Sequence, residues 1–378
     1  MTIKHLSYRM LSALLLAWLL TGCGKEDGQA TETSAADAGG QPALAQDAAE
    51  AASEPASAAA NSEIVVLAAD EVIPWLQSEN WWGEISEGEQ VEAPHLILTG
   101  INPAWQENSQ KLPVADKKAL FYRLMLPLVL HANQMTMERR ERLLQAQAEL
   151  NAEGRVSAES LAFLQHIGRV IPEFTAAEAQ ALTADDAGLG ELIDDLLVRI
   201  DFVPPGLALG QAAYESGYGT SRFAVEGNSL FGQWTYKGDG MEPTNKRAEK
   251  GNYGLKAFEW PFDSVRGYFI NLMSHAAYED FRQLRAKLRA QGEPLDSLHL
   301  ADGLLRYSER GQDYVDSLKG MIRKNGLNRA DDATFRDEPI RFLVAGGDAD
   351  NAAQVRAEIE KMREAGQLEE IYARMRLE

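Results

Sequence analysis

The sequence predicts a mainly helical α+β fold, and two patterns support this class. Between residues 113 and 201, apolar residues recur every three or four positions, which is the spacing of an amphipathic helix. The run EIVVLAADEVIPWL at residues 63–76 is instead typical of a short strand or loop region, and PIRFLVAGG at residues 339–347 is typical of a strand. With 378 residues, of which 45% are hydrophobic, the chain can form one large domain or two modest ones.

The N-terminal segment is predicted to be a targeting signal. Lys4 and Arg9 give it a basic start, and an apolar run follows over residues 10–20. The run is too short to span a membrane comfortably, and it ends in Leu-Thr-Gly-Cys, which resembles the bacterial lipobox. We therefore expect residues 1–22 to be a lipoprotein signal peptide and Cys23, the sole cysteine, to carry a lipid anchor in the membrane.

The composition of residues 23–62 predicts a disordered tether. They are rich in Ala, Gly, Ser, Glu and Asp and lack apolar periodicity, so they cannot bury enough apolar area to offset the entropy of ordering. As a flexible coil, this tether would reach roughly 35 Å in root-mean-square extension. Because Gly24 follows the acylation position, the usual sorting pattern favours the outer membrane. We expect a lipid-anchored protein on the periplasmic face of the cell envelope.

The charge distribution argues against one class of partner. The formal net charge is -20, yet residues 201–330 hold 17 Lys and Arg against 16 Asp and Glu. Residues 24–63 hold 8 acidic residues and 1 basic residue, so the acidity lies largely outside the middle of the chain. No basic stripe interleaved with aromatic residues is present, and we expect no nucleic-acid partner.

Three helices are expected in the first half of the body. The longest covers residues 113–150, and Pro127 is expected to kink or divide it, because proline removes a backbone donor and clashes with the preceding turn. The other two cover residues 157–171 and 187–201, where the apolar spacing is again helical.

The most informative segment begins with a short helix. Pro204 and Pro205 suit its start, whereas Gly217 and Gly219 suit its end. This places Glu215 in the last turn, on a face of small residues. Burial and the negative end of the helix dipole both disfavour the ionised carboxylate, which predicts a general acid that is protonated near neutral pH. Glycoside hydrolysis requires such an acid beside the leaving-group oxygen.

A motif follows this helix. Glu-Ser-Gly-x-Gly, which begins at Glu215, precedes Asn-Ser-Leu-Phe-Gly at residues 228–232. Together these elements resemble the signature of flagellar-type and autolysin-type peptidoglycan glucosaminidases, glycoside hydrolase family 73, and most closely its Bax-like branch. The resemblance covers about residues 195–328. It implies a lysozyme-like fold with a small β-hairpin lobe, and cleavage of β-1,4 N-acetylglucosaminyl linkages in peptidoglycan.

The resemblance also implies site residues. Glu215 would be the general acid, and a hairpin beyond the motif would carry a second acidic residue. Glu249, just before the expected turn at residues 250–252, fits best, and Glu242 is the alternative. If neither acts, the N-acetyl group of the sugar could attack instead. Tyr314 falls on the tyrosine that lines the cleft opposite the acid.

Aromatic residues near the motif are candidates for stacking on sugar rings. We expect Trp234 in a cleft, whereas Phe231 is expected to belong to the core although it lies in the motif. The full expected set of substrate-binding residues is Asn228, Phe231, Trp234, Tyr253 and Tyr314.

The expected organisation therefore has three parts after the tether: a helical N-terminal part of the body at 63–200, a glucosaminidase domain at 201–330, and a C-terminal strand-helix extension at 331–378. Peptidoglycan strands are the expected substrate, with no metal and no cofactor. Two other functions remain open. One is a non-catalytic module that binds glycan or an assembly partner. The other is an amidase, which would need zinc or a Cys/His pair that the scattered histidines do not provide.

Overall fold

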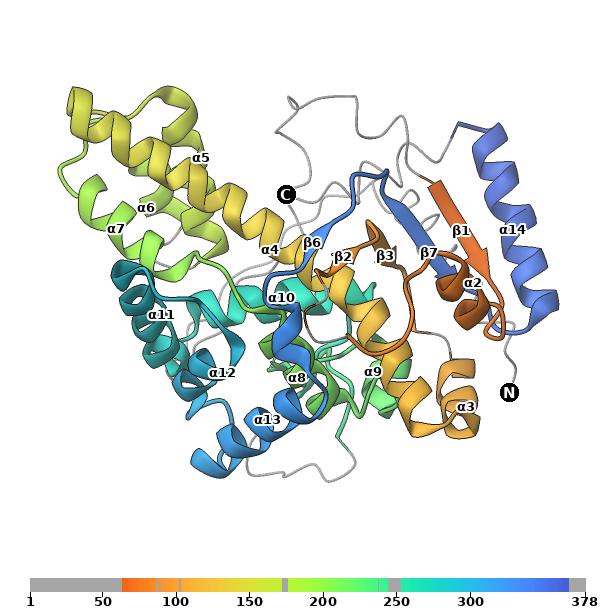
Figure 1. Cartoon of the computed structure of the whole chain (residues 1–378). Coiled ribbons are helices and arrows are strands. Elements are labelled where there is room, and N and C mark those ends of the chain that lie inside the picture. Colours follow the sequence, from red (N-terminus) through yellow and green to blue (C-terminus); the bar gives the residue numbers. More distant parts are fainter. Residues whose placement is uncertain are drawn as a thin grey trace.

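The computed structural model describes residues 63–366, except for short stretches at 86–87, 89, 102, 172–175, 237 and 244–252. The expected signal peptide, tether and Cys23 lie outside the described residues. Helices predominate and the sheets are small, so the mainly helical α+β class is confirmed. The long helix α4 (Val114–Glu153) crosses the molecule from a group of helices at one end to the small sheet at the other (Figure 1).

Helix α4 remains a single helix through Pro127, so the predicted division does not occur. The proline lacks the N–H that would bond to the carbonyl of Arg123. The indole Nε1 of Trp81 donates to that carbonyl at 2.7 Å and takes the place of the missing donor. Trp81 is held there because the Arg123 guanidinium lies over its ring, 4.4 Å from the centroid, and donates to the carbonyl of Gly83. A side chain distant in sequence thus satisfies the backbone group that proline leaves free.

The predicted helices pack on the C-terminal half of α4. Helices α5 (Ala158–Val170) and α7 (Leu189–Arg199) confirm the expectations for residues 157–171 and 187–201, and α6 (Ala176–Ala181) lies between them in sequence. Ser157 begins α5 by accepting a hydrogen bond from the backbone of Ser160. Both α5 and α7 contact α4.

Helix α8 (Pro205–Ser216) lies at the centre of the second half of the chain, with most of its residues buried. Helices α10 (Pro261–Ser274) and α13 (Gln312–Lys324) and the short helix η5 (Leu327–Ala330) surround it. Close approach depends on glycine: a Cβ at Gly206 would lie 2.5 Å from the carbonyl oxygen of Leu327. The small-residue face expected for this helix is the face that its neighbours cover.

A three-stranded parallel sheet joins the two ends of the described chain. Its order is β1 (Glu63–Leu67), β7 (Arg341–Ala345) and β3 (Leu96–Leu98). The strands near residues 63 and 340 are confirmed, but their pairing was not foreseen in the sequence. Helix α14 (Ala349–Glu364) packs on β1, and α4 packs on β3. Short helices α2 (Val72–Ser78) and α3 (Pro103–Lys111) complete this unit.

The smaller sheets are two-residue pairings. Strands β2 (Glu92–Ala93) and β6 (Thr334–Phe335) are parallel, and β4 (Trp234–Thr235) and β5 (Gly254–Leu255) are antiparallel. The β4–β5 pair is the described part of the hairpin lobe, and Met241 forms a further bridge to Leu255. Glu249 and the expected turn at residues 250–252 lie outside the described residues.

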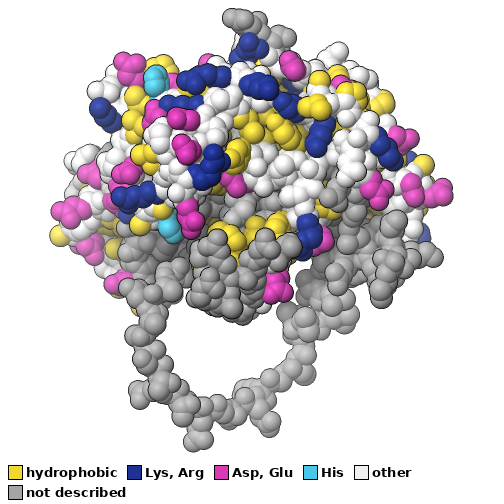
Figure 2. All heavy atoms as spheres, turned by 90° about the horizontal axis from the view of Figure 1, so that it is seen from below, with side chains coloured by type: hydrophobic (Ala, Val, Ile, Leu, Met, Phe, Trp, Pro, Cys, Tyr) yellow, Lys and Arg dark blue, Asp and Glu magenta, His cyan; other side chains and the backbone are white. Residues whose placement is uncertain are grey.

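The other described elements are helices that lie before β4 or after β5 along the chain. These are α9 (Arg222–Gly227), η3 (Ala276–Tyr278), α11 (Glu279–Gln291), α12 (Ser297–Leu300) and η4 (Ala301–Leu304). Of the helices that the structure describes, none has the length and apolar content needed to cross a bilayer. Figure 2 shows acidic and basic side chains interspersed over one face, with hydrophobic side chains gathered toward its middle.

Candidate active site

The last turn of α8 positions Glu215. Gly217 ends the helix in the left-handed conformation with φ 59°, which glycine adopts without strain. The hydroxyl of Ser216 donates to the carbonyl of Ala212 and accepts from the backbone N–H of Gly219 at 2.9 Å. Ser216 therefore closes the helix end and fixes the turn after Glu215.

The Glu215 carboxylate is half-buried and lies against a buried tyrosine. The Tyr314 hydroxyl, from α13, donates to Oε1 of Glu215 at 3.2 Å. Burial raises the pKa of Glu215, and the hydrogen bond from Tyr314 opposes that rise without cancelling it. The carboxyl group consequently retains its proton to a higher pH than a solvated glutamate does.

Further tyrosines surround this pair and keep its environment weakly polar. Tyr307 stacks on Tyr314 with ring centroids 5.3 Å apart, and Tyr214 meets Tyr314 edge to face at 5.5 Å. Tyr278 lies 5.7 Å from Tyr307. Burial raises the pKa of both Tyr278 and Tyr307, and the negative charge of Glu215 adds to the effect. These hydroxyls therefore stay protonated and act as neutral donors.

A directed chain of hydrogen bonds ends at Glu215. The Tyr268 hydroxyl donates to Oε1 of Gln211 at 2.5 Å, and Nε2 of Gln211 donates to the Tyr314 hydroxyl at 3.1 Å. Because Tyr314 accepts from Gln211, its own proton is directed to Oε1 of Glu215. When Glu215 is protonated, the proton must then reside on Oε2.

The oxygen that carries this proton lies beside a glycine of the motif. A Cβ at Gly232 would lie 3.7 Å from Oε2 of Glu215, and Gly232 adopts a left-handed φ of 63°. A side chain here would strain the backbone, and its Cβ would be in van der Waals contact with Oε2. Glycine therefore suits this turn beside the acidic oxygen.

The side-chain amide of Asn228 holds three backbone segments together. Its Oδ1 accepts from the N–H of Ile101 at 3.1 Å, and its Nδ2 donates to the carbonyls of Phe258 and Glu259 at 3.2 and 2.8 Å. The residue also ends α9 in the left-handed conformation, which asparagine tolerates better than most residues. The structure thus places this candidate substrate-binding residue at a junction beneath the motif.

Phe231, within the motif, and Trp234, two residues after its end, lie in different surroundings. Phe231 is buried and stacks on Tyr268 with centroids 4.1 Å apart, so it belongs to the core beside the hydrogen-bond chain. Its backbone carbonyl accepts from the Tyr307 hydroxyl at 3.2 Å. Trp234 is 48% exposed and packs against the buried Tyr253, with centroids 5.2 Å apart. Of the aromatic residues near the motif, Trp234 and Tyr236, which is 69% exposed, present their rings to solvent, whereas Phe231 and Tyr253 are buried.

The structure describes one of the two candidates for the second catalytic carboxylate. Glu249 lies outside the described residues. Glu242 is exposed at the start of the connection between β4 and β5, and its backbone carbonyl accepts from Arg222 at 2.6 Å. In the part of the chain that the structure describes, no group of three or more His, Cys, Asp or Glu side chains could hold a metal ion.

Several residues around Glu215 were not identified from the sequence as site residues. The most informative is Gln211, which is fully buried one turn before Glu215 on the same helix face. A glutamine within an otherwise apolar helix is a signal that could have been used, because a buried amide requires partners. Tyr268 of α10, and Tyr278 and Tyr307, gave no local signal of that kind, whereas Tyr314 was named from the resemblance.

The sequence comparison defines the class of this region. Residues 193–327 match the family model for Glucosaminidase, mannosyl-glycoprotein endo-beta-N-acetylglucosaminidase, in agreement with the extent of the predicted resemblance. The chain therefore contains a glucosaminidase domain, and this family indicates glycoside hydrolase activity on glycans.

A distant homologue is Protein bax of Escherichia coli (strain K12). It is 35% identical to the chain over 130 residues, which are 34% of this chain and 46% of that protein. The chain thus spans about half the length of the curated relative it matches. No solved structure matches the chain.

Proposed function

We propose that the glucosaminidase domain hydrolyses β-1,4 N-acetylglucosaminyl linkages of peptidoglycan, with Glu215 as the general acid. The observation that carries this proposal is the environment of the Glu215 carboxyl group: burial raises its pKa, the Tyr314 hydroxyl bonds to Oε1, and Oε2 lies beside Gly232. A carboxylic acid with one engaged oxygen and one open oxygen can deliver a proton in a single direction.

In the proposed reaction, the open oxygen protonates the glycosidic oxygen as the bond from that oxygen to C1 breaks. The leaving sugar departs as a neutral alcohol, and positive charge develops at C1 and the ring oxygen. Glu215 becomes a carboxylate, which Tyr314 stabilises by donating to Oε1. Gln211 and Tyr268 act as positioning residues, because they keep the Tyr314 hydroxyl directed toward Glu215.

The second half of the reaction needs a group that completes the attack on C1. We propose Glu249, with Glu242 as the alternative, because both lie on the connection that follows β4. Either carboxylate would take a proton from the attacking water, while the water oxygen bonds to C1. If neither substitution reduces activity, the N-acetyl group of the substrate is the remaining nucleophile.

For substrate binding, we propose that Trp234 stacks on a sugar ring and that Tyr253 packs against the Trp234 ring and holds it in place. The exposed ring of Trp234 and its contact with Tyr253 support this assignment. Asn228 and Phe231 would contribute by holding the motif in place, since both side chains are buried.

The location of the protein is also a proposal. A lipid anchor at Cys23 would hold the domain at the periplasmic face of the envelope, the compartment of its proposed substrate. Incorporation of labelled fatty acid into the wild-type chain, and its loss in Cys23→Ala, would support the anchor. Equal labelling of both chains would contradict it.

Digestion of purified sacculi tests the reaction. Mass spectrometry of the released fragments should find N-acetylglucosamine at the reducing end in the wild-type digest and none in the Glu215→Gln digest. Reducing-end N-acetylmuramic acid would contradict the linkage, free stem peptides would indicate an amidase, and no release by the wild type would indicate a binding module.

A further inference from the structure

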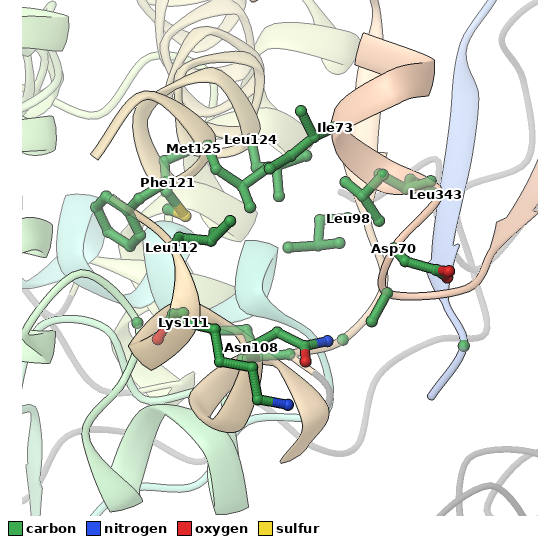
Figure 3. A pocket seen from close by; sticks show the side chains of 18 residues that line it. Asp70, Ile73, Leu98, Asn108, Lys111, Leu112, Phe121, Leu124, Met125 and Leu343 are labelled. Carbon is green, nitrogen blue, oxygen red and sulfur yellow. The ribbon is translucent and has the colours of Figure 1, made fainter. Parts of the chain in front are cut away.

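A second hollow, which we call the sheet cavity, lies at the carboxyl ends of β1, β3 and β7. Its volume is about 330 Å³; helices α2, α3 and α4 line it, and it is partly open to solvent (Figure 3). The apolar lining comes from these helices and from β3 and β7, and includes Ile73, Leu98, Leu112, Phe121, Leu124 and Leu343. Neither Glu215 nor Tyr314 lines it, although Gly219 of the motif does, so the sheet cavity adjoins the turn after Glu215 without including the Glu215 carboxylate.

The size of the sheet cavity is unusual for a protein interior. Interiors are close-packed, and they contain few voids larger than a water molecule. An apolar cavity of about 150 Å³ stays dry and binds benzene, and the sheet cavity is more than twice as large. Its volume lies within the range of small-molecule sites, and the carboxyl ends of parallel strands are where α/β sheets commonly bind ligands.

Apart from Ser109, which is buried, the polar side chains that line the sheet cavity lie at its edge. Asn108 is half-buried and Lys111 is exposed, and both belong to α3 on one side of the cavity, whereas Phe121 and Met125 line the opposite side (Figure 3). The carboxylate of Asp70 points away from the apolar side chains. This distribution suits a ligand with a long apolar part and a polar end beside α3.

The charges at the edge favour an anionic end. Lys111 is exposed, and the ion pairs of the described residues do not include it, so we expect its ammonium group to pair with the anionic end of a ligand. The amide of Asn108 can donate a second hydrogen bond to the same group. The exposed carboxylate of Asp70 disfavours an anion on the sheet side, which directs the charged end toward α3.

We propose that the sheet cavity binds the acyl chain of a fatty acid, with the carboxylate beside Lys111 and Asn108. Binding is non-covalent, and burial of the methylene groups drives it. Each additional methylene should strengthen binding about fourfold until the cavity is full. This inference is independent of the proposed glycan hydrolysis.

Calorimetric titration of the full chain with octanoate, decanoate, dodecanoate and tetradecanoate, each below its micelle concentration, tests the proposal. We expect saturable binding of one molecule, affinity that rises with chain length and then stops rising, and a higher melting temperature in the presence of ligand. No saturable binding, or affinity that keeps rising with length as in adsorption to a surface, would overturn it.

Substitutions locate the binding to the sheet cavity. Ile73→Trp fills the cavity from a half-buried position and should weaken decanoate binding at least tenfold, and Leu112→Trp does the same from α3 if the first variant is unfolded. Leu144→Trp, at a 45% exposed position of α4, is the matched control and should bind as the wild type does. Unchanged binding by a folded cavity variant would refute the site.

The charged end has its own test. Lys111→Gln should weaken decanoate binding but leave decanol binding unchanged, whereas Asp70→Asn should leave decanoate binding equal or stronger. Loss of affinity for both ligands in Lys111→Gln would contradict the assigned orientation. Glu215→Gln should bind decanoate normally, which separates this inference from the proposed catalytic role.

Discussion

The surroundings of Glu215 and the sheet cavity are connected by one helix, because α4 packs against both α8 and β3. Around Glu215, a chain of buried hydrogen bonds gives each polar side chain a defined partner and orientation. Around the sheet cavity, the contacts are almost entirely apolar, so they define a volume without fixing an orientation. The comparison shows that a buried polar network can determine where a proton lies, whereas apolar packing determines only what size of group fits.

The strongest test of this contrast is Glu215→Gln. We expect kcat to fall by about 10³-fold, because general acid catalysis contributes on the order of 10²- to 10⁴-fold. The release of reducing ends from sacculi measures it. Glu226→Gln, at an exposed ion-paired site on the neighbouring α9, is the matched control and should stay within about twofold of the wild type. Equal losses in both variants would remove the distinction between the two glutamates.

The hydrogen-bond chain is tested by Tyr314→Phe. Because the Tyr314 hydroxyl lowers the pKa of Glu215 against the effect of burial, its removal should raise that pKa further. The alkaline side of the pH–activity profile should move to higher pH, and kcat should fall by about tenfold. Tyr307→Phe keeps the aromatic stack and removes a hydroxyl that bonds elsewhere, so its profile should not move. A shift of the same size in both variants would contradict the directed chain.

The hydrogen bond from Trp81 that supports α4 at Pro127 is tested by Trp81→Phe. Loss of the indole donor leaves the carbonyl of Arg123 without a partner beside Pro127, which should cost about 1–3 kcal/mol in the free energy of unfolding. Chemical denaturation measures the change. In the Pro127→Ala background a backbone N–H becomes available, so the same tryptophan substitution should cost less. Equal costs in the two backgrounds would show that the carbonyl is not the cause.

A smaller effect is expected in the pH dependence of stability. The pKa of Glu215 is raised in the folded state above its ordinary value of 4.5, so its stabilising contribution is complete below that value and is lost as pH rises through the folded pKa. Glu215→Gln lacks this loss and should gain stability relative to the wild type between mildly acidic and neutral pH. Melting temperatures measured across that interval test the sign, and a constant difference would contradict it.

The smallest expected effect concerns the sheet cavity. Leu98→Phe adds volume at its wall and should stabilise the protein by about 0.5–2 kcal/mol, the usual gain from filling a cavity. Hydrolysis should be unchanged, because Leu98 does not contact the network around Glu215. A folded Leu98→Phe variant with altered kcat would show that the two regions are coupled.

The sequence predicted the local elements of the site better than their arrangement. Prolines and glycines correctly marked the ends of α8 and placed Glu215 in its last turn, because helix ends depend on nearby residues. Of the two outcomes expected at Pro127, a kink or a division, the division does not occur, since the donor that replaces the missing N–H comes from the distant Trp81. The pairing of β1 with β7 was missed for the same reason: parallel strands far apart in sequence leave no mark in a local pattern.

The directed hydrogen bonds at Glu215 also required the three-dimensional structure. Gln211 could be placed on the same helix face as Glu215, but its partners Tyr268 and Tyr314 lie 57 and 103 residues away. Which oxygen of Glu215 carries the proton depends on those partners. The candidate stacking residues were similar in the sequence, and only burial separates exposed Trp234 from buried Tyr253.

The strand order β1-β7-β3 also has a consequence for synthesis of the protein. The central strand is the last of the three along the chain, so its two neighbours cannot find their shared partner until the chain beyond the intervening glucosaminidase domain is available. Until then, the newly made β1 and β3 expose unpaired edges, which are prone to pair with other chains. Nascent molecules would therefore depend on prompt completion, or on a chaperone that shields those edges.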